Sequence, residues 1–201
     1  YMLRVEQTTT LVVREYQITR EDMLRALQET FAKDLKQWNA EFLGDMTLRF
    51  NNPDVLFAVG SSELRPAFKN ILADFFPRYL AILTQPQFKK SIKEIRIEGH
   101  TSSFWRSAPP EKAYFLNMEL SQARTRAVLE YVLGLDACKP DQEWLKANMT
   151  ANGLSSSRLI HRQDGAVDEV ASQRVEIRLV TNAEEQMTTL AKGVGVQKQS
   201  P

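Results

Sequence analysis

The segment 117–128, NMELSQARTRAV, contains the residues whose types and spacing are best suited to chemistry. Ser121 precedes a run with helical spacing, and we interpret it as the N-cap of a helix. This interpretation places Arg124 and Arg126 in the first turns, where the positive end of the helix dipole disfavours a cation. Free backbone N–H groups beside a guanidinium group instead form a receptor for an anion.

A predicted strand should bring small hydroxyl side chains to the same place. The strand ends in the sequence EGHTSS, which contains Thr101 and Ser102. Because consecutive strand, loop and helix elements usually lie side by side, a carboxylate bound by Arg124 would face these hydroxyl groups. The alternative is that Arg124 forms an ordinary salt bridge with Glu119 or Glu130.

Other reactive side chains do not form a catalytic or metal-binding pattern. His100 and His161 lack carboxylate or cysteine partners at ligand spacing, which favours structural or solvent-exposed roles. The serines 155–157 have neither a Gly-x-Ser-x-Gly turn nor a paired base. The sequence also lacks a phosphate-binding loop and paired catalytic acids. We therefore expect no enzymatic activity, no metal and no cofactor.

Trp105 is the most interesting aromatic residue, because the predicted loop around it is polar. It could pack beneath that loop, or it could contact a ligand or a partner. Trp38 and Trp144 are expected in the core.

The composition limits the classes of partner. The chain has 26 basic and 25 acidic side chains, and a net charge of +1 gives no field that recruits nucleic acid or an anionic membrane. Cys138 is the single cysteine, so neither an internal disulfide nor a thiolate metal cluster can form. No apolar run approaches the ~20 residues that span a bilayer, and no signal peptide is visible.

The N-terminal part, residues 1–44, is predicted to be a linker with a strand and an amphipathic helix. The run TTLVVREYQI has the composition of a strand. A helix is expected over roughly 20–43, because apolar residues recur at steps of three and four: Leu24, Leu27, Phe31, Leu35, Trp38 and Phe42. This stripe could pack onto its own domain, or it could pair with a second copy in a dimer.

The rest of the chain predicts strands and helices in the order β–β–α–β–α–(α)–β–β. Strands are expected at MTLRF, DVLFAV, KEIRIEGH, ANGLSSSRLI and SQRVEIRLV; helices are expected at RPAFKNILADFFPRYLAIL, near 120–134 and near 141–148. Pro77 should kink or break the first of these helices. In the strand KEIRIEGH, Glu94, Arg96 and Glu98 should face water. The order predicts an α+β fold over residues 45–182, with a small mixed sheet backed by helices, followed by a disordered tail at 183–201.

Four of these stretches resemble, in order, the OmpA C-terminal family, which includes MotB-type stator subunits and peptidoglycan-associated lipoproteins. They are VLFAVGSSELRPAF, similar to the family's strand and x-L-x-P helix start; IRIEGHTSS, similar to its G-H-T-D strand end; NMELSQARTRAV, similar to its N-x-x-L-S-x-x-R-A helix start; and QRVEIRLV, similar to its R-R-V-E-I closing strand. Each stretch alone is weakly specific, but the ordered set is strongly specific. The resemblance implies an OmpA-like α/β sandwich.

The resemblance also implies a module that binds the diaminopimelate of peptidoglycan stem peptides. In the family, the arginine of L-S-x-x-R pairs with a ligand carboxylate, and Arg124 occupies that position. The asparagine, leucine and serine of the motif match Asn117, Leu120 and Ser121. An arginine of the closing segment matches Arg174.

One departure from the family lies at the strand end, where Thr101 and Ser102 complete the predicted ligand site. The family has an acid that receives the ligand ammonium, and Ser102 stands in its place. A hydroxyl group can accept this donor, but losing the charge should cost about 1–3 kcal/mol. Glu111 or Glu119 could substitute for the missing acid.

The resemblance gives a first hypothesis for function: a cell-wall anchor that holds a membrane-tethered complex in the periplasm. MotB-type proteins dimerise and join a MotA/ExbB-like ion channel through an N-terminal membrane helix, which would be absent from this chain. Such units serve flagellar motors and, in some cases, anti-phage defence.

The second hypothesis is a protein-interaction scaffold, or a passive outer-membrane anchor, that has kept the fold and lost diaminopimelate binding. Ser102 motivates this alternative. Retention by purified sacculi distinguishes the two hypotheses.

Overall fold

Alternating apolar and polar residues produce strands that assemble into a five-stranded sheet. The computed structural model describes residues 2–182, so the predicted disordered tail lies outside the described residues. The strand order is β1-β2-β5-β3-β4, and β3 pairs with β4 in parallel while the other pairs are antiparallel. The strands are β1 (Ala40–Phe42), β2 (Thr47–Phe50), β3 (Ile92–His100), β4 (Met149–Gly153) and β5 (Arg174–Thr181). The predicted mixed sheet is confirmed.

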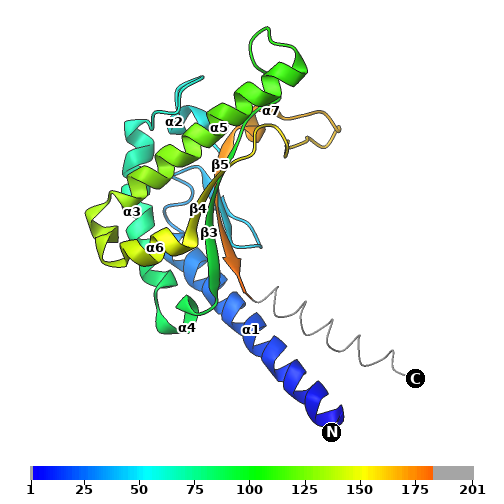
Figure 1. Ribbon diagram of the computed structural model, residues 1–201, viewed down its shortest axis with the longest axis vertical. Coiled ribbons are helices and arrows are strands. Elements are labelled where there is room, and N and C mark those ends of the chain that lie inside the picture. The colour runs from blue at the N-terminus through cyan, green and yellow to red at the C-terminus, as the bar shows by residue number, and fades with distance from the viewer. Residues whose placement is uncertain (1, 183–201) are drawn as a thin grey trace.

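Helices make up much of the described chain outside the sheet. They are α1 (Met2–Phe31), α2 (Pro53–Leu56), α3 (Pro66–Leu83), α4 (Pro86–Lys89), α5 (Pro110–Leu133), α6 (Gln142–Asn148) and α7 (Glu169–Ser172), with a 3-10 helix at Asp136–Asp141. Figure 1 shows α3, α5 and α6 on the same side of the sheet, while α1 extends away from the domain toward the N-terminus. The predicted helices at 66–83 and near 141–148 are confirmed.

An aromatic cluster joins α1 to the domain. The ring of Phe75 in α3 lies 5.0 Å from Phe31 of α1, 6.1 Å from Phe50 of β2 and 4.9 Å from Tyr79. Phe31, Phe50 and Phe75 are fully buried, as are Met23 and Leu27 on the same face of α1. The predicted apolar stripe therefore packs onto its own domain along the last turns of α1.

The predicted strand within residues 1–18 is wrong, because α1 runs without interruption from Met2 to Phe31. The β-branched residues of that run have only a weak preference for strands, which a continuing helix overrides. The predicted helical range 20–43 is also too long. The chain turns after Phe31, and Ala40–Phe42 form the edge strand β1, which pairs with β2.

The predicted strand DVLFAV is a second correction. Its first residues form the short helix α2, because Pro53 suits the first turn of a helix. Phe57 then makes an isolated antiparallel bridge with Leu64. Pro77 lies inside α3 without ending it. The element order therefore differs from the predicted one, with the edge strand β1 between the N-terminal helix and β2, and with α2 in place of the second expected strand.

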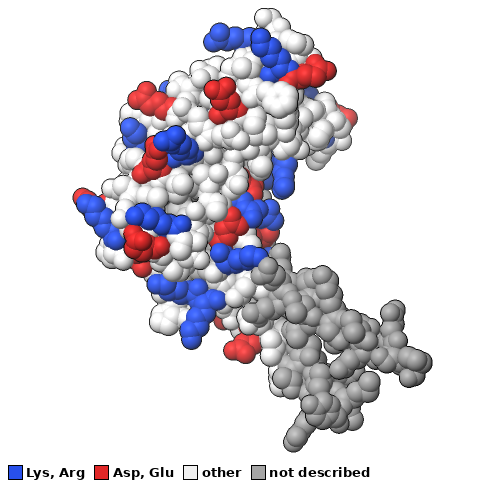
Figure 2. All heavy atoms as spheres, in the orientation of Figure 1, with Lys and Arg blue, Asp and Glu red and all other residues white. Residues whose placement is uncertain are grey.

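The surface carries charges of both signs. In Figure 2, basic and acidic side chains alternate over the visible face, in agreement with the balanced composition. None of the helices described between residues 2 and 182 combines the length and the apolar character needed to cross a membrane.

Candidate functional site

Arg124 lies in the interior of α5. The predicted N-cap at Ser121 is wrong, because α5 begins at Pro110, which suits the first turn of a helix as a residue without an N–H group. Arg124 is therefore several turns away from the helix start. The helix dipole and free N–H groups do not create its environment.

Backbone carbonyl groups hold the Arg124 side chain instead. Its Nε donates to the carbonyl oxygen of Ser61 at 2.9 Å, and Nη2 donates to that of Ala58 at 3.2 Å. The guanidinium carbon lies 4.8 Å from the ring centre of Phe57, at a distance that allows a cation–π contact. The residues before α3 thus fix the direction of a side chain that belongs to α5.

Arg124 is buried without an acidic partner. It is 9% exposed, and none of residues 2–182 forms a salt bridge with it. Arg126 rather than Arg124 pairs with Glu130, at 2.8 Å, so the alternative of an Arg124 salt bridge with Glu119 or Glu130 is wrong. Burial lowers the pKa of the Arg124 guanidinium to about 10, which leaves it charged at neutral pH.

A hollow of about 300 Å³ opens beside Arg124, and we call it the strand-end hollow. It lies between the end of β3, the side of α5 and the segment before α3. Its lining residues are Val59, Gly60, Thr101, Ser102, Phe104, Trp105, Arg106, Asn117, Leu120, Arg124 and Gln173. The structure thus brings together five of the predicted site residues, Thr101, Ser102, Asn117, Leu120 and Arg124.

Asn117 fixes the loop that follows β3. Its side-chain amide donates to the carbonyl oxygen of Ser102 at 3.1 Å and to that of Phe104 at 3.3 Å. The backbone N–H of Thr101 donates to Ser155 at 3.0 Å. The buried Thr101 hydroxyl has no hydrogen-bond partner among the described residues. Hydrogen bonds from α5 and from the segment after β4 therefore hold this wall of the hollow in place.

The opposite rim is apolar. Val59 is 94% exposed and Phe104 is 67% exposed, and both line the strand-end hollow together with the half-buried Trp105. Exposed apolar side chains of this size beside an open hollow are typical of a surface that contacts a ligand or partner. This position favours the ligand-contact interpretation of Trp105.

Ser121 and Arg174 lie outside the strand-end hollow. The Ser121 hydroxyl is buried, donates to the carbonyl of Met118 at 2.9 Å and accepts from the backbone N–H of Ser155 at 3.1 Å. It therefore links α5 to the segment after β4. Arg174 is also buried, and its Nε pairs with Glu176 at 2.6 Å.

An acid that the sequence did not single out lies beside the strand end. The carboxylate of Glu169, at the start of α7, accepts hydrogen bonds from the backbone N–H of Ser103 at 2.9 Å and from its hydroxyl group. Gln173, one turn later, lines the hollow. Glu111 and Glu119, the expected substitutes for the family acid, are exposed and do not line it.

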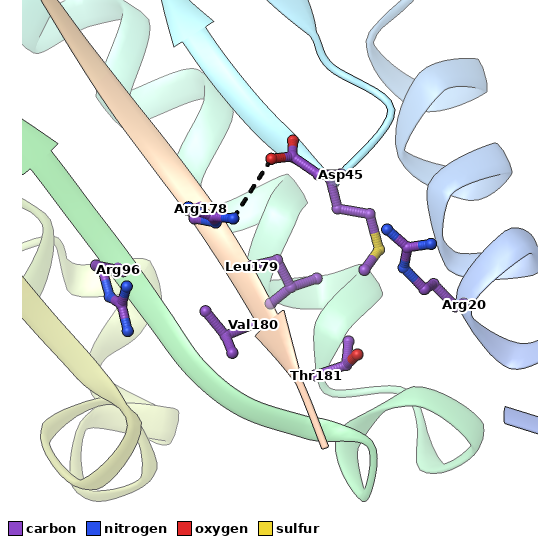
Figure 3. Close-up of a pocket in the computed structure, with 8 residues that line it drawn as sticks. Arg20, Asp45, Arg96, Arg178, Leu179, Val180 and Thr181 are labelled. Carbon is purple, nitrogen blue, oxygen red and sulfur yellow. Dashed lines mark ion pairs between the residues drawn. The ribbon is translucent and has the colours of Figure 1, made fainter. Parts of the chain in front are cut away.

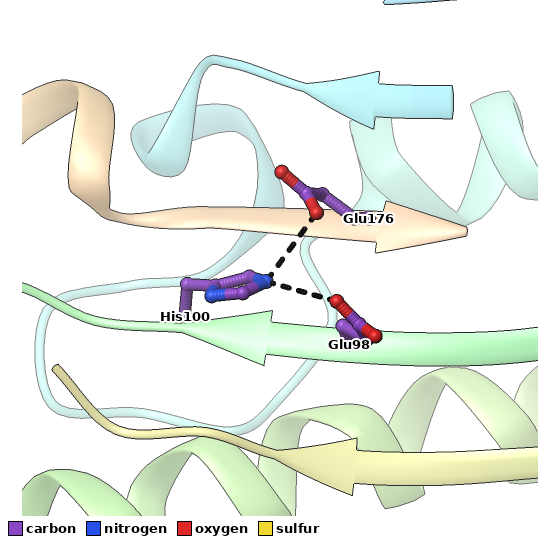
Figure 4. Close-up of side chains that lie close together, drawn as sticks. All are labelled: Glu98, His100 and Glu176. Atoms are coloured by element: carbon purple, nitrogen blue, oxygen red, sulfur yellow. Dashed lines mark ion pairs between the residues drawn. The ribbon is translucent and has the colours of Figure 1, made fainter. Parts of the chain in front are cut away.

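The end of β3 also carries a buried group of ionisable side chains. Nε2 of His100 lies 3.5 Å from a carboxylate oxygen of Glu98 and 3.5 Å from one of Glu176 on β5 (Figure 4). Glu98 is 2% exposed, so the prediction that it faces water is wrong. The histidine does have carboxylate neighbours, one from its own strand and one from β5, which sequence spacing could not reveal.

This group resembles a cation site in its residue types, but its charges are already matched. The second oxygen of Glu176 accepts from Arg174 at 2.6 Å and from Arg49 at 2.8 Å, while Glu98 lies 3.7 Å from Arg96. A divalent ion would add charge beside these arginines, at a cost that burial increases. We therefore interpret the group as an ion-pair network that joins β2, β3 and β5.

The network predicts how stability depends on pH. Burial alone raises the pKa of Glu176, but its contacts with His100 and Arg174 outweigh that effect and lower the pKa below its ordinary value of 4.5. A carboxyl group whose pKa falls on folding stabilises the protein above its unfolded pKa and loses that contribution as pH falls through the folded value. Glu176→Gln should therefore lower the free energy of unfolding by about 2 kcal/mol at neutral pH. The difference from wild type should shrink below about pH 4.

Urea unfolding at several pH values measures this difference. Glu130→Gln is the control, because the carboxylate of Glu130 is exposed and its pair with Arg126 should contribute little. A difference between wild type and Glu176→Gln that stays constant down to pH 3 would contradict the prediction.

Glycines let α5 lie directly on the sheet. A Cβ atom on Gly153 of β4 would meet the backbone N of Gln122 at 2.2 Å. A Cβ atom on Gly99 of β3 would meet the carbonyl oxygen of Ser121 at 2.9 Å. Both positions therefore require glycine, and the close approach sets the distance between α5 and the end of β3.

Comparisons with known proteins show which proteins the chain resembles. A family model described as the OmpA family matches residues 56–172, which include the glycine contacts and every lining residue of the hollow except Gln173. The Zorya protein ZorB of Escherichia coli is 47% identical over 174 residues, which cover 86% of this chain and 73% of that protein.

Solved structures share the fold at low sequence identity. A MotB-like protein from Desulfovibrio vulgaris superimposes with a TM-score of 0.59 and 23% identity, over 84% of this chain and 94% of that chain. The cell wall anchor of the type VI secretion system from Pseudomonas aeruginosa gives 0.52 and 21%, over 77% and 96%. The periplasmic domain of Helicobacter pylori MotB gives 0.51 and 18%, over 81% and 92%.

Proposed function

Because this chain belongs to the OmpA family, we propose that its strand-end hollow binds peptidoglycan stem peptides noncovalently and anchors a membrane-tethered complex to the cell wall. The observation that carries the proposal is Arg124, a buried cation without an acidic partner among residues 2–182, at the side of an open hollow. A buried charge is costly until an anion pairs with it. A carboxylate-bearing ligand would supply that anion.

Each wall of the hollow has a proposed role. Arg124 binds a stem-peptide carboxylate, and Asn117 holds the loop that presents Thr101 and Ser102 to the ligand. Leu120 contributes apolar contact. We propose that the other predicted residues, Ser121 and Arg174, act indirectly by fixing α5 and β5, since they lie outside the hollow.

The relatives suggest the assembly that the domain serves. The identity with ZorB supports a MotB-like stator-type subunit of an anti-phage system, and the cell wall anchor of Pseudomonas aeruginosa shares the fold. We propose that the domain works in the periplasm, tethered to the inner membrane by a segment outside this chain. It would act as a homodimer with a MotA/ExbB-like channel subunit.

Sedimentation with purified sacculi tests the function. The protein should pellet with sacculi containing diaminopimelate and should be displaced by soluble stem peptide. A protein that stays in the supernatant at every sacculus concentration would contradict peptidoglycan binding. It would support the alternative of a protein-interaction scaffold or passive anchor, which Ser102 in place of the family acid favours.

Glu169 is proposed to take over the role of the missing acid. Its carboxylate is held against Ser103, next to Ser102, and can attract a ligand ammonium group electrostatically. Glu169→Gln should weaken binding to sacculi about 3- to 10-fold, because an amide group loses the charge. Glu111→Gln, an exposed acid outside the hollow, is the matched control. Equal binding by both variants would show that Ser102 alone serves the ammonium group.

A further inference from the structure

A second hollow, of about 250 Å³, lies at the opposite end of the sheet from the strand-end hollow. It is bordered by Arg20 of α1, Arg96 of β3 and Arg178 of β5, and Asp45 is the one acid among the lining residues that belong to the described part of the chain. We call it the arginine hollow. Figure 3 shows Arg20 extending from α1 toward the strands that carry the other two arginines.

The two strand arginines are placed unfavourably for a sheet. Arg96 and Arg178 are direct partners in the antiparallel register of β3 and β5. Like charges directly opposite each other destabilise a sheet. The charge of Arg96 is partly neutralised by Glu94 on the same strand, because a carboxylate oxygen of Glu94 lies 2.6 Å from Nη2 of Arg96. Arg178 lies 3.6 Å from Asp45, which is longer than a hydrogen bond, and it also interacts electrostatically with Glu98.

Arg20 adds a third cation from α1. It lies three residues before Met23 and seven before Leu27, so the face of α1 that enters the core also carries Arg20. Arg20 is half-buried, and no hydrogen bond or ion pair joins it to another residue within 2–182. Arg20 thus lies on the packed face of α1, its donors are unused within residues 2–182, and its side chain lines the hollow.

We propose that the arginine hollow binds a phosphate group. Arg20 and Arg178 come from two different elements, and neither side chain donates a hydrogen bond to another of residues 2–182. Guanidinium groups match the tetrahedral oxygens of phosphate through paired hydrogen bonds. A bound dianion would also screen the repulsion between Arg96 and Arg178. The phosphate could belong to a soluble ion or to a lipid headgroup, and both sources present the same oxygens.

Calorimetric titration of the full chain with inorganic phosphate, at constant ionic strength, tests the site. Phosphate should bind saturably, and Arg20→Gln and Arg178→Gln should each weaken it about tenfold or more. Arg126→Gln is the control, because Arg126 is an exposed arginine on α5. Flotation with phosphatidylglycerol vesicles distinguishes the sources: arginine-dependent flotation without binding of free phosphate assigns a lipid headgroup.

Two results would overturn the proposal. The first is that neither probe binds. The second is that the Arg20→Gln and Arg178→Gln variants bind as tightly as wild type. Melting temperatures equal to wild type confirm that the arginine variants fold.

Discussion

Arg124→Gln is expected to weaken binding to sacculi by about 100-fold. The guanidinium group is the charged donor at the side of the strand-end hollow, and it is buried without an acidic partner among residues 2–182. A charge-assisted hydrogen-bonded pair in such a place contributes about 1.5–3 kcal/mol, which corresponds to roughly one to two orders of magnitude in affinity. Sedimentation over a range of sacculus concentrations measures the change.

Controls separate the loss of binding from a loss of structure. Arg126→Gln removes a neighbouring charge that points into solvent and pairs with Glu130, and its affinity should be unchanged. Arg124 also holds the carbonyl groups of Ala58 and Ser61, so its removal could disturb the preceding loop. Leu120→Glu leaves those contacts intact and places a competing carboxylate in the hollow, and it should weaken binding as well. Full binding by both Arg124→Gln and Leu120→Glu would exclude the hollow as the site.

Gly153→Ala is expected to destabilise the domain by about 3 kcal/mol or more. The new methyl group would lie 2.2 Å from the backbone N and 2.7 Å from the Cα of Gln122, so a helix backbone has to move. Overpacking of this kind typically costs about 1–3 kcal/mol, and contact with backbone atoms places this position at the upper end. Thermal and urea unfolding measure the loss.

Gly44→Ala is the matched control, since nothing lies within 4 Å of the added Cβ atom. It should change the free energy of unfolding by less than about 0.5 kcal/mol. Equal stability of the two variants would mean that α5 does not rest on β4 as described. Because α5 carries Asn117, Leu120 and Arg124, Gly153→Ala should also weaken binding to sacculi.

The sequence was sufficient to place the residues of α5 on one side of the site. Asn117, Leu120 and Arg124 are three, four and seven residues apart, and such residues share a helix face wherever the helix begins. Their convergence with Thr101 and Ser102 follows from the neighbouring strand end. The prediction therefore succeeded for these residues although the N-cap assigned to Ser121 was wrong.

Long-range contacts explain what the sequence could not show. Glu169 reaches Ser103 across 66 residues, and Arg124 reaches Ala58 across the same separation. The spacing of residues along the sequence cannot predict contacts between residues so far apart in the chain. The prediction for the N-terminal segment was wrong for a different reason. Its β-branched residues favoured a strand, whereas the segment belongs to a continuous helix whose last turns pack around Phe31.

The way α1 is fixed has a mechanical consequence. Phe31 and Leu27 are enclosed by the core, and the helix then continues without interruption back to Met2. Thirty residues at about 1.5 Å each make a rod of roughly 45 Å. A twisting or pulling force on this rod would be transmitted first to the aromatic cluster around Phe75, and only then to the loops. Torque applied at its N-terminal end would therefore turn the sheet and the strand-end hollow together.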